Sequence, residues 1–155
     1  MSVEYVLPGD AEAAYLVAIC QELHSLGSYR DIPFDWQFML ENARMIIHSD
    51  THYACLARSP EYGVFGYVAG NLEWFWFSPQ CYAQEGAWYV RAGVKDRAKT
   101  AFALMRSFVK WAESKGALMV QSGDIANIDT VAVHGAYTRL GFKRYGVIYK
   151  YERAG

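Results

Sequence analysis

The chain contains two kinds of segment, one with apolar residues at every third or fourth position and one with apolar residues at every second position. The first spacing is typical of an amphipathic helix and the second of a half-buried strand. Aspartates precede three of the helical segments as candidate N-caps, and glycines end three of them. The pattern predicts helices at 10–27, 35–48, 96–115 and 129–140, and strands at 2–7, 51–58, 63–77, 83–92, 117–122 and 143–152.

These elements follow the order β-α-α-β-β-β-α-β-α-β. The segments 83–92, 96–115 and 117–122 form a β-α-β unit, which requires a parallel pair of strands, whereas the three consecutive strands before the helix favour an antiparallel meander. We therefore predict an α/β domain of the α+β type, with a mixed, mainly antiparallel central sheet and helices on both faces. Ligands of such sheets favour the crevice at the carboxyl ends of the strands, here residues 90–100.

Composition narrows the class of protein. The 155 residues fit one domain, 1–155, and 53% hydrophobic with 20% charged residues indicates a globular protein. A net charge of −1 without a basic run argues against nucleic acid as a partner. The start "MSVEYVLPGD" is unlike a signal peptide and no apolar run is long enough to span a bilayer, so we expect a cytoplasmic protein and no membrane partner.

The segment "KDRAKTAFALM" (95–105) opens the third helix with three basic residues. A helix N-terminus with nearby cations can bind a phosphate, although a solvated helix start has the same composition. Loops that wrap phosphates usually contain glycine, and this segment has none. From these residues alone, the solvated helix start is favoured.

Two stretches resemble the GNAT superfamily of acyl-CoA-dependent N-acyltransferases. "WYVRAGVKDRAKTAFALMRSFVKWAESKGA" (88–117) is similar to the family's central strand, pyrophosphate loop and long helix, and "AYTRLGFKRYG" (136–146) is similar to its late helix and following turn. The element order extends the resemblance over the whole chain. The loop departs from the family pattern, because Thr100 and Phe102 stand where glycine or a small residue is usual.

The resemblance implies an N-acetyltransferase that uses acetyl-CoA as co-substrate and transfers the acetyl group to a primary amine by direct attack in a ternary complex. In such an enzyme the pantetheine arm lies along a strand and the pyrophosphate lies at a helix start. The cofactor-binding residues implied are Val90, Arg91 and Ala92 for the pantetheine arm, and Arg97, Ala98, Lys99, Thr100, Ala101 and Phe102 for the pyrophosphate.

The same resemblance implies that Tyr137 is the general acid that protonates the leaving thiolate; the alternative is a tyrosine of the core stripe. Glu85 is the candidate general base, although a family-style alignment puts Gln84 at that position. Glu73 is a second candidate. For each glutamate the alternative, which the residue type favours, is a carboxylate at a sheet edge or in solvent, and an ordered water can replace a dedicated base.

The acceptor side is predicted from the loop 25–36 and the aromatic run "LEWFWFSP" (72–79). The run is either a strand buried on both faces or an aromatic wall for the acceptor or a dimer. Candidate acceptor-binding residues are Tyr29, Arg30, Trp36 and Trp74. We expect a small-molecule or peptide amine as acceptor, no metal, and an aromatic-rich surface compatible with a homodimer. The alternative function is a non-catalytic binding or assembly module with an eroded cofactor site.

Overall fold

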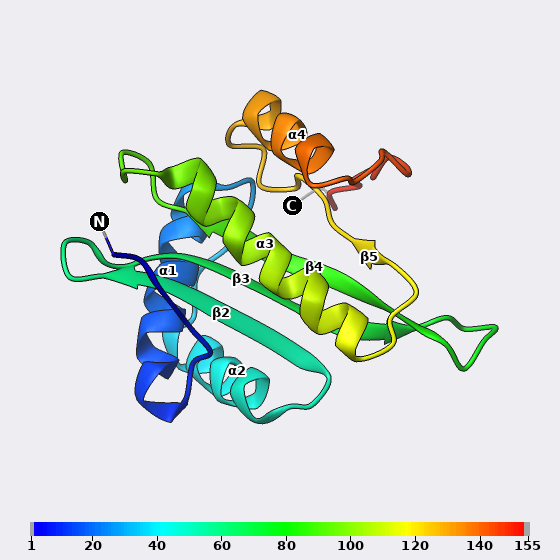
Figure 1. Cartoon of the computed structure of the whole chain (residues 1–155), viewed down its shortest axis with the longest axis horizontal. Coiled ribbons are helices and arrows are strands. Elements are labelled where there is room, and N and C mark those ends of the chain that lie inside the picture. Colours follow the sequence, from blue (N-terminus) through cyan, green and yellow to red (C-terminus); the bar gives the residue numbers. More distant parts are fainter. Residues whose placement is uncertain (1, 154–155) are drawn as a thin grey trace.

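Five strands form a single sheet in the computed structural model, which describes residues 2–153 (Figure 1). The spatial order follows the chain, β1-β2-β3-β4-β5, with antiparallel pairs from β1 to β4 and a parallel pair between β4 and β5. This is the predicted antiparallel meander with one parallel strand after a helix. The strands are β1 (Glu4–Val6), β2 (His52–Ser59), β3 (Gly63–Trp74), β4 (Cys81–Val90) and β5 (Val120–Gln121).

The helices begin close to the predicted caps. Asp35 accepts a hydrogen bond from the N–H of Phe38 (2.9 Å), and Asp129 accepts one from the N–H of Ala132 (3.4 Å). A short 3-10 turn, η1, precedes the first helix. The elements are η1 (Asp10–Glu12), α1 (Ala13–Leu26), α2 (Trp36–His48), α3 (Arg97–Ser114) and α4 (Thr130–Arg139).

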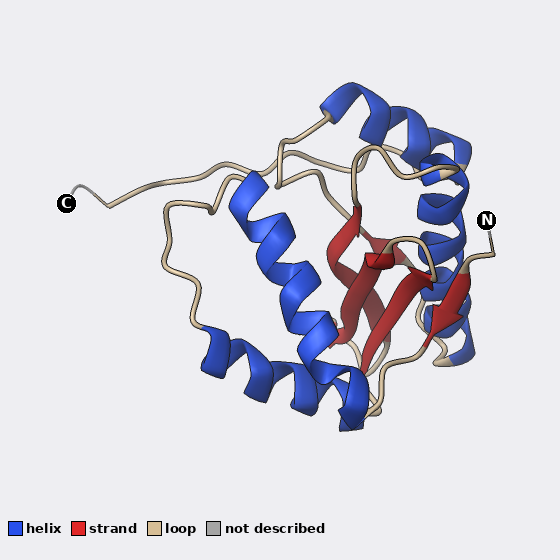
Figure 2. Ribbon diagram, turned by 90° about the vertical axis from the view of Figure 1, so that its left-hand side faces the viewer, coloured by secondary structure: helices blue, strands red, loops and turns tan. Residues whose placement is uncertain are grey.

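Each face of the sheet carries its own hydrophobic core. On one face, α1 and α2 pack over Leu56 and Tyr67, with Leu16 fully buried between helix and sheet. On the other face, α3 packs Phe108 against Phe65 and other apolar residues of the sheet. Figure 2 shows the helices on both sides of the strands. The predicted fold class, with helices on both faces of a mixed sheet, is confirmed.

Strand β4 contains a bulge that interrupts its pairing with β3. Glu85 lies opposite Gly70 and Ala87 lies opposite Ala69, so Gly86 is an extra residue. The crowding at Gly70 requires glycine, because a Cβ atom there would lie 2.6 Å from the ring of Phe108. Beyond the bulge, the outer edge of β4 is not paired with β5, which ends at Gln121 opposite Gln84.

Two predicted strands are corrected. The strand 63–77 ends at Trp74, and the hairpin 75–80 follows, with Trp76 95% and Phe77 69% exposed. The interpretation as a strand buried on both faces is therefore wrong for these residues. The strand predicted at 143–152 is not formed, and its apolar residues are exposed; Figure 2 shows this end of the chain running away from the sheet. Alternation indicates which face a strand would bury, but it does not supply a neighbour to pair with.

Within the described part of the chain, no helix is long and apolar enough to cross a bilayer. Among residues 2–153, no group of three or more His, Cys, Asp or Glu side chains is arranged to hold a metal ion.

Candidate active site

Three side chains from separate elements meet beside the bulge of β4. The hydroxyl of Ser122, which follows β5, donates a hydrogen bond to Oε2 of Glu85 (2.5 Å) and forms another with the hydroxyl of Tyr137 on α4. The Tyr137 hydroxyl also lies 3.4 Å from Oε2 of Glu85. The structure therefore brings together the two residues that the sequence suggested for acid–base chemistry, with a serine between them.

Glu85 is the buried carboxylate of this cluster, with 8% of its surface exposed. Burial disfavours the charged form and raises the pKa of Glu85 from 4.5 to about 7, although the hydrogen bonds from Ser122 and Tyr137 oppose this shift. A pKa near neutrality suits a general base. Of the other candidates, Gln84 has no titratable group, and its amide donates to the backbone oxygen of Glu85 (3.0 Å). Glu73 is exposed.

Tyr137 is half-buried against Trp88 of β4, with ring centroids 5.3 Å apart. Burial raises the pKa of Tyr137 most strongly, and the nearby charge of Glu85 raises it further. The hydroxyl therefore keeps its proton through the pH range around 7 in which Glu85 ionises.

Ser122 was not among the site residues predicted from the sequence. Its position at the carboxyl end of the predicted strand 117–122, the end at which ligands of such sheets bind, was the available signal. Asp124, two residues later, was also missed. Its Oδ2 atom is buried without a hydrogen-bond partner among the described residues, while its Oδ1 accepts from the N–H of Asn127 (3.1 Å). A buried oxygen of this kind is available to a bound ligand.

The predicted pyrophosphate site is the start of α3. The first intrahelical hydrogen bond joins the N–H of Thr100 to the oxygen of Asp96 (3.0 Å), so the N–H groups of residues 97–99 precede the hydrogen-bonded ladder. Asp96 makes no side-chain cap, and its backbone has a positive φ of 58°. Ala98 and Lys99 are exposed, whereas the side chain of Thr100 is buried. Ala101 and Phe102 are partly exposed on the first turns of the helix.

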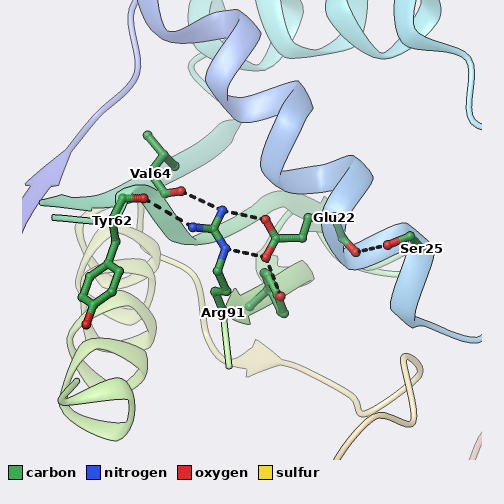
Figure 3. A network of polar contacts seen from close by, with 6 residues as sticks. Glu22, Ser25, Tyr62, Val64 and Arg91 are labelled. Atoms are coloured by element: carbon green, nitrogen blue, oxygen red, sulfur yellow. Dashed lines mark hydrogen bonds and ion pairs between the residues drawn. The ribbon is translucent and has the colours of Figure 1, made fainter. Parts of the chain in front are cut away.

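The end of β4 is held by side chains as well as by sheet pairing. The Arg91 guanidinium binds the Glu22 carboxylate of α1 through two nitrogens (2.8 and 2.7 Å) and donates to the carbonyls of Tyr62 and Val64 (3.3 and 3.2 Å; Figure 3). The same carboxylate accepts from the hydroxyl of Tyr89 (2.8 Å). This network fixes the C-terminal half of α1 to the strand.

The three residues predicted to hold the pantetheine arm lie in different environments. The N–H of Arg91 bonds to the oxygen of Phe65 on β3, so it belongs to the sheet, and the oxygen of Val90 accepts from Nε of Arg97 (2.9 Å). Ala92 is exposed. A direct ligand role for these residues stays a prediction; the side chain of Arg91 has a structural partner.

The predicted acceptor residues do not all lie near Glu85. Tyr29 and Arg30 are in the loop after α1, and this loop contacts the segment after β5 through a hydrogen bond from Ser28 to the oxygen of Ala126 (3.2 Å). Trp36 is at the start of α2, where its indole donates to Gln21 (3.3 Å). Trp74 is the last residue of β3, next to the hairpin 75–80; Figure 1 shows the hairpin between β3 and β4 far from α4.

No protein-family model and no curated protein matches the sequence. The solved structures described next match nearly the whole chain at low identity. Aminoglycoside 6'-N-acetyltransferase AAC(6')-Iy, solved with the bisubstrate analogue CoA-S-monomethyl-acetylneamine, has a TM-score of 0.75 and 14% identity, covering 99% of this chain and 100% of that one. AAC(6')-Ih from Acinetobacter baumannii has a TM-score of 0.71 and 16% identity, with coverages of 99% and 100%.

Ribosomal-protein-alanine N-acetyltransferase from Brucella melitensis is also similar, with a TM-score of 0.72 and 13% identity, covering 99% of this chain and 100% of that one. Its name gives an acceptor of a different kind from an aminoglycoside. Identities this low show a shared fold and leave the substrate open. The chain has the acyl-CoA N-acetyltransferase fold that the resemblance to the GNAT superfamily predicted.

Proposed function

We propose that this chain is an N-acetyltransferase that moves an acetyl group from acetyl-CoA to a primary amine. The observation that carries the proposal is the cluster of Glu85, Ser122 and Tyr137 at the bulge of β4. The cluster combines a buried base with a pKa of about 7 and a protonated phenol, joined by a hydroxyl. A fold shared with N-acetyltransferases supports the same conclusion.

The surroundings of the cluster fit an extended thioester substrate. Among residues 2–153, no strand pairs with the outer edge of β4 beyond Gln84, so its backbone groups can pair with an amide-containing arm. The start of α3 offers N–H groups at the positive end of the helix dipole, beside the exposed side chains of Lys95 and Lys99. Phe102 sits further along the helix, and the first three N–H groups do not depend on it.

The reaction requires one proton to leave the amine and one to reach the sulfur. Acetyl-CoA supplies the acetyl thioester; the amine nitrogen forms a bond to the acetyl carbon as the C–S bond breaks. In the proposed mechanism, the Glu85 carboxylate takes the proton of the amine, directly or through water, and the Tyr137 hydroxyl gives its proton to the thiolate. The proton then passes from Glu85 through Ser122 to Tyr137, which restores the starting state.

Electrostatics couples the two ends of this path. The charge of Glu85 raises the pKa of Tyr137. When Glu85 takes a proton, that charge disappears and the pKa of Tyr137 falls, so the phenol becomes a stronger acid as the amine attacks. The two groups therefore titrate as a coupled pair.

The cellular setting follows from the same proposal. The free thiols of Cys20, Cys55 and Cys81 are at least partly buried, and burial raises the pKa of Cys20 to about 11, which makes it a poor nucleophile. Free thiols suit the reducing cytoplasm. A cytoplasmic location and a homodimer stay predictions.

The test measures transfer of a labelled acetyl group from acetyl-CoA to small and peptide amines. We expect transfer by the wild type, and a loss of about 10²-fold or more in turnover for Tyr137→Phe. Tyr15→Phe, at an exposed tyrosine of α1, is the matched control and should retain wild-type turnover. Transfer that is undetectable with every amine class, from a folded protein, would favour the non-catalytic module instead.

A further inference from the structure

A partly open cavity of about 220 Å³ lies between the helices α1 and α2 and the strands β3 and β4. Its floor consists of four small residues on the two strands, and its walls include long apolar side chains of the two helices. The floor residues are Ala69, Gly70, Gly86 and Ala87, and the walls include Leu16 and Met39.

Small residues form the floor of the cavity. A Cβ atom at Gly70 would point to the opposite face of the sheet, where it would lie 2.6 Å from the ring of Phe108, so Gly70 offers only backbone to the cavity. Gly86 is the extra residue of the bulge, and its neighbour Ala87 contributes only a methyl group. An apolar ligand that enters this partly open cavity gains stability by burying its own surface.

The cavity adjoins the bulge through the backbone of Gly86, although Glu85, Ser122 and Tyr137 do not themselves line it. Gly86 lines the cavity and directly follows Glu85, whose carboxylate belongs to the cluster with Ser122 and Tyr137. Gly86 is exposed and has no side chain, and the edge of β4 beside it is not paired with β5. A molecule in the cavity can therefore extend past Gly86 to the strand edge with its amine next to Glu85.

The lining selects for an uncharged apolar group. None of the described residues that line the cavity is a carboxylate, lysine or arginine. The imidazole of His52 is already hydrogen-bonded to Ser49 (2.8 Å), and burial keeps the pKa of Tyr67 well above 10. A second ammonium group placed here would lose its water without gaining a counter-charge, which makes a polycationic acceptor unfavourable.

The volume limits the size of this group. An apolar cavity of about 150 Å³ accommodates benzene, so 220 Å³ suits one aromatic ring or one branched alkyl group. We infer that the acceptor is a primary amine bearing a single compact apolar group, which occupies this cavity while the amine reaches Glu85. This inference rests on the proposed acetyl transfer and names its acceptor class.

The first experiment compares three acceptors with the wild-type protein and acetyl-CoA: phenethylamine, ethylamine and the polycationic aminoglycoside sisomicin. Burying one ring should raise kcat/KM for phenethylamine about 10- to 100-fold over ethylamine. We expect sisomicin to be the poorest of the three. Equal kcat/KM for phenethylamine and ethylamine, or a preference for sisomicin, would overturn the inference.

The second experiment fills the cavity without touching the catalytic cluster. Ala87→Phe should lower kcat/KM for phenethylamine at least about tenfold more than kcat/KM for ethylamine. The milder Ala87→Val should do so to a smaller extent if the larger ring disturbs folding. Ala18→Phe, on the exposed side of α1, is the matched control and should change neither acceptor. Equal losses for both amines in the two Ala87 variants would contradict the assignment.

A binding measurement separates this inference from the proposed function. In the absence of acetyl-CoA, phenethylamine should raise the melting temperature of the wild type and of Ala18→Phe, but not that of Ala87→Phe. No shift in the wild type would overturn the cavity assignment even if acetyl transfer occurs. A specific shift without any acetyl transfer would keep the cavity as a binding site and reject the enzyme.

Discussion

Replacing Glu85 by glutamine should abolish its role as a base and also make the folded protein more stable at neutral pH. The folded-state pKa of about 7 exceeds the ordinary value of 4.5 by about 2.5 units. At about 1.36 kcal/mol per unit, ionising the buried carboxylate costs about 3 kcal/mol. Because the pKa is raised, this cost is absent below pH 4.5, grows as the pH rises, and is complete above pH 7.

The assay is chemical denaturation of the wild type and Glu85→Gln between pH 4.5 and 8. We expect the variant to gain up to about 3 kcal/mol in free energy of unfolding over the wild type across this window. In parallel, kcat/KM of the wild type should rise with an apparent pKa of about 7, because only the ionised carboxylate accepts a proton. Glu85→Gln should be about 10²- to 10⁴-fold slower and lack this inflection.

The matched control is Glu73→Gln, at an exposed glutamate of the neighbouring strand. Its stability relative to the wild type should not change across the same pH window, and its activity should be retained. The reasoning about Glu85 is refuted if the stability difference for Glu85→Gln is independent of pH, or if the variant keeps the wild-type rate profile.

Tyr137→Phe should lower turnover, measured by initial rates, about 10²-fold or more. It should leave the rise in melting temperature caused by acetyl-CoA, measured by differential scanning fluorimetry, unchanged. An equal loss of turnover and of the thermal shift would make Tyr137 a structural residue. Ser122→Ala removes a hydrogen bond that lowers the pKa of Glu85, so the inflection in the pH profile of kcat/KM should move above pH 7. An unchanged pH profile would show that Ser122 does not influence the base. Gly70→Ala forces a Cβ atom against an aromatic ring of α3 and should lower the free energy of unfolding by about 1–3 kcal/mol. Gly135→Ala, where α4 leaves open space around the Cβ atom, should not lower it. Similar free energies of unfolding for the two variants would contradict the crowding at Gly70.

Helix positions followed from the sequence because capping and apolar periodicity are local. Asp35 and Asp129 cap α2 and α4 as their spacing suggested. Strand limits were less accurate, because pairing depends on distant residues. The aromatic run after Trp74 alternates like a strand, yet the chain turns there and Phe75 bonds back to Gln80.

The resemblance named Glu85 and Tyr137 as candidate catalytic residues, but it did not give their arrangement. The register that places Glu85 rather than Gln84 in the cluster depends on the bulge at Gly86. An isolated glycine within a strand is the sequence signal for such a bulge. Ser122 could not be recognised as the link between Glu85 and Tyr137, since the contact joins elements 15 and 37 residues apart.

The start of α3 shows which part of the phosphate hypothesis depends on side chains. The missing glycines at Thr100 and Phe102 suggested an eroded site. The structure buries the Thr100 side chain, and the N–H groups of residues 97–99 remain at the helix start. Phosphate binding by those groups requires no glycine at Thr100, because backbone N–H groups in helical geometry can donate to an anion.

The most direct test of the account is the melting temperature of the wild-type chain titrated with acetyl-CoA, with ADP as a control that shares the pyrophosphate. At 100-fold excess over its Kd, acetyl-CoA should add about 2.7 kcal/mol of stability, which is about 5–10 °C for a domain of this size. We predict a shift of this order for acetyl-CoA and a smaller one for ADP. An unchanged melting temperature at millimolar acetyl-CoA, or equal shifts with both ligands, would contradict the assignment of this chain as an acetyl-CoA-dependent enzyme.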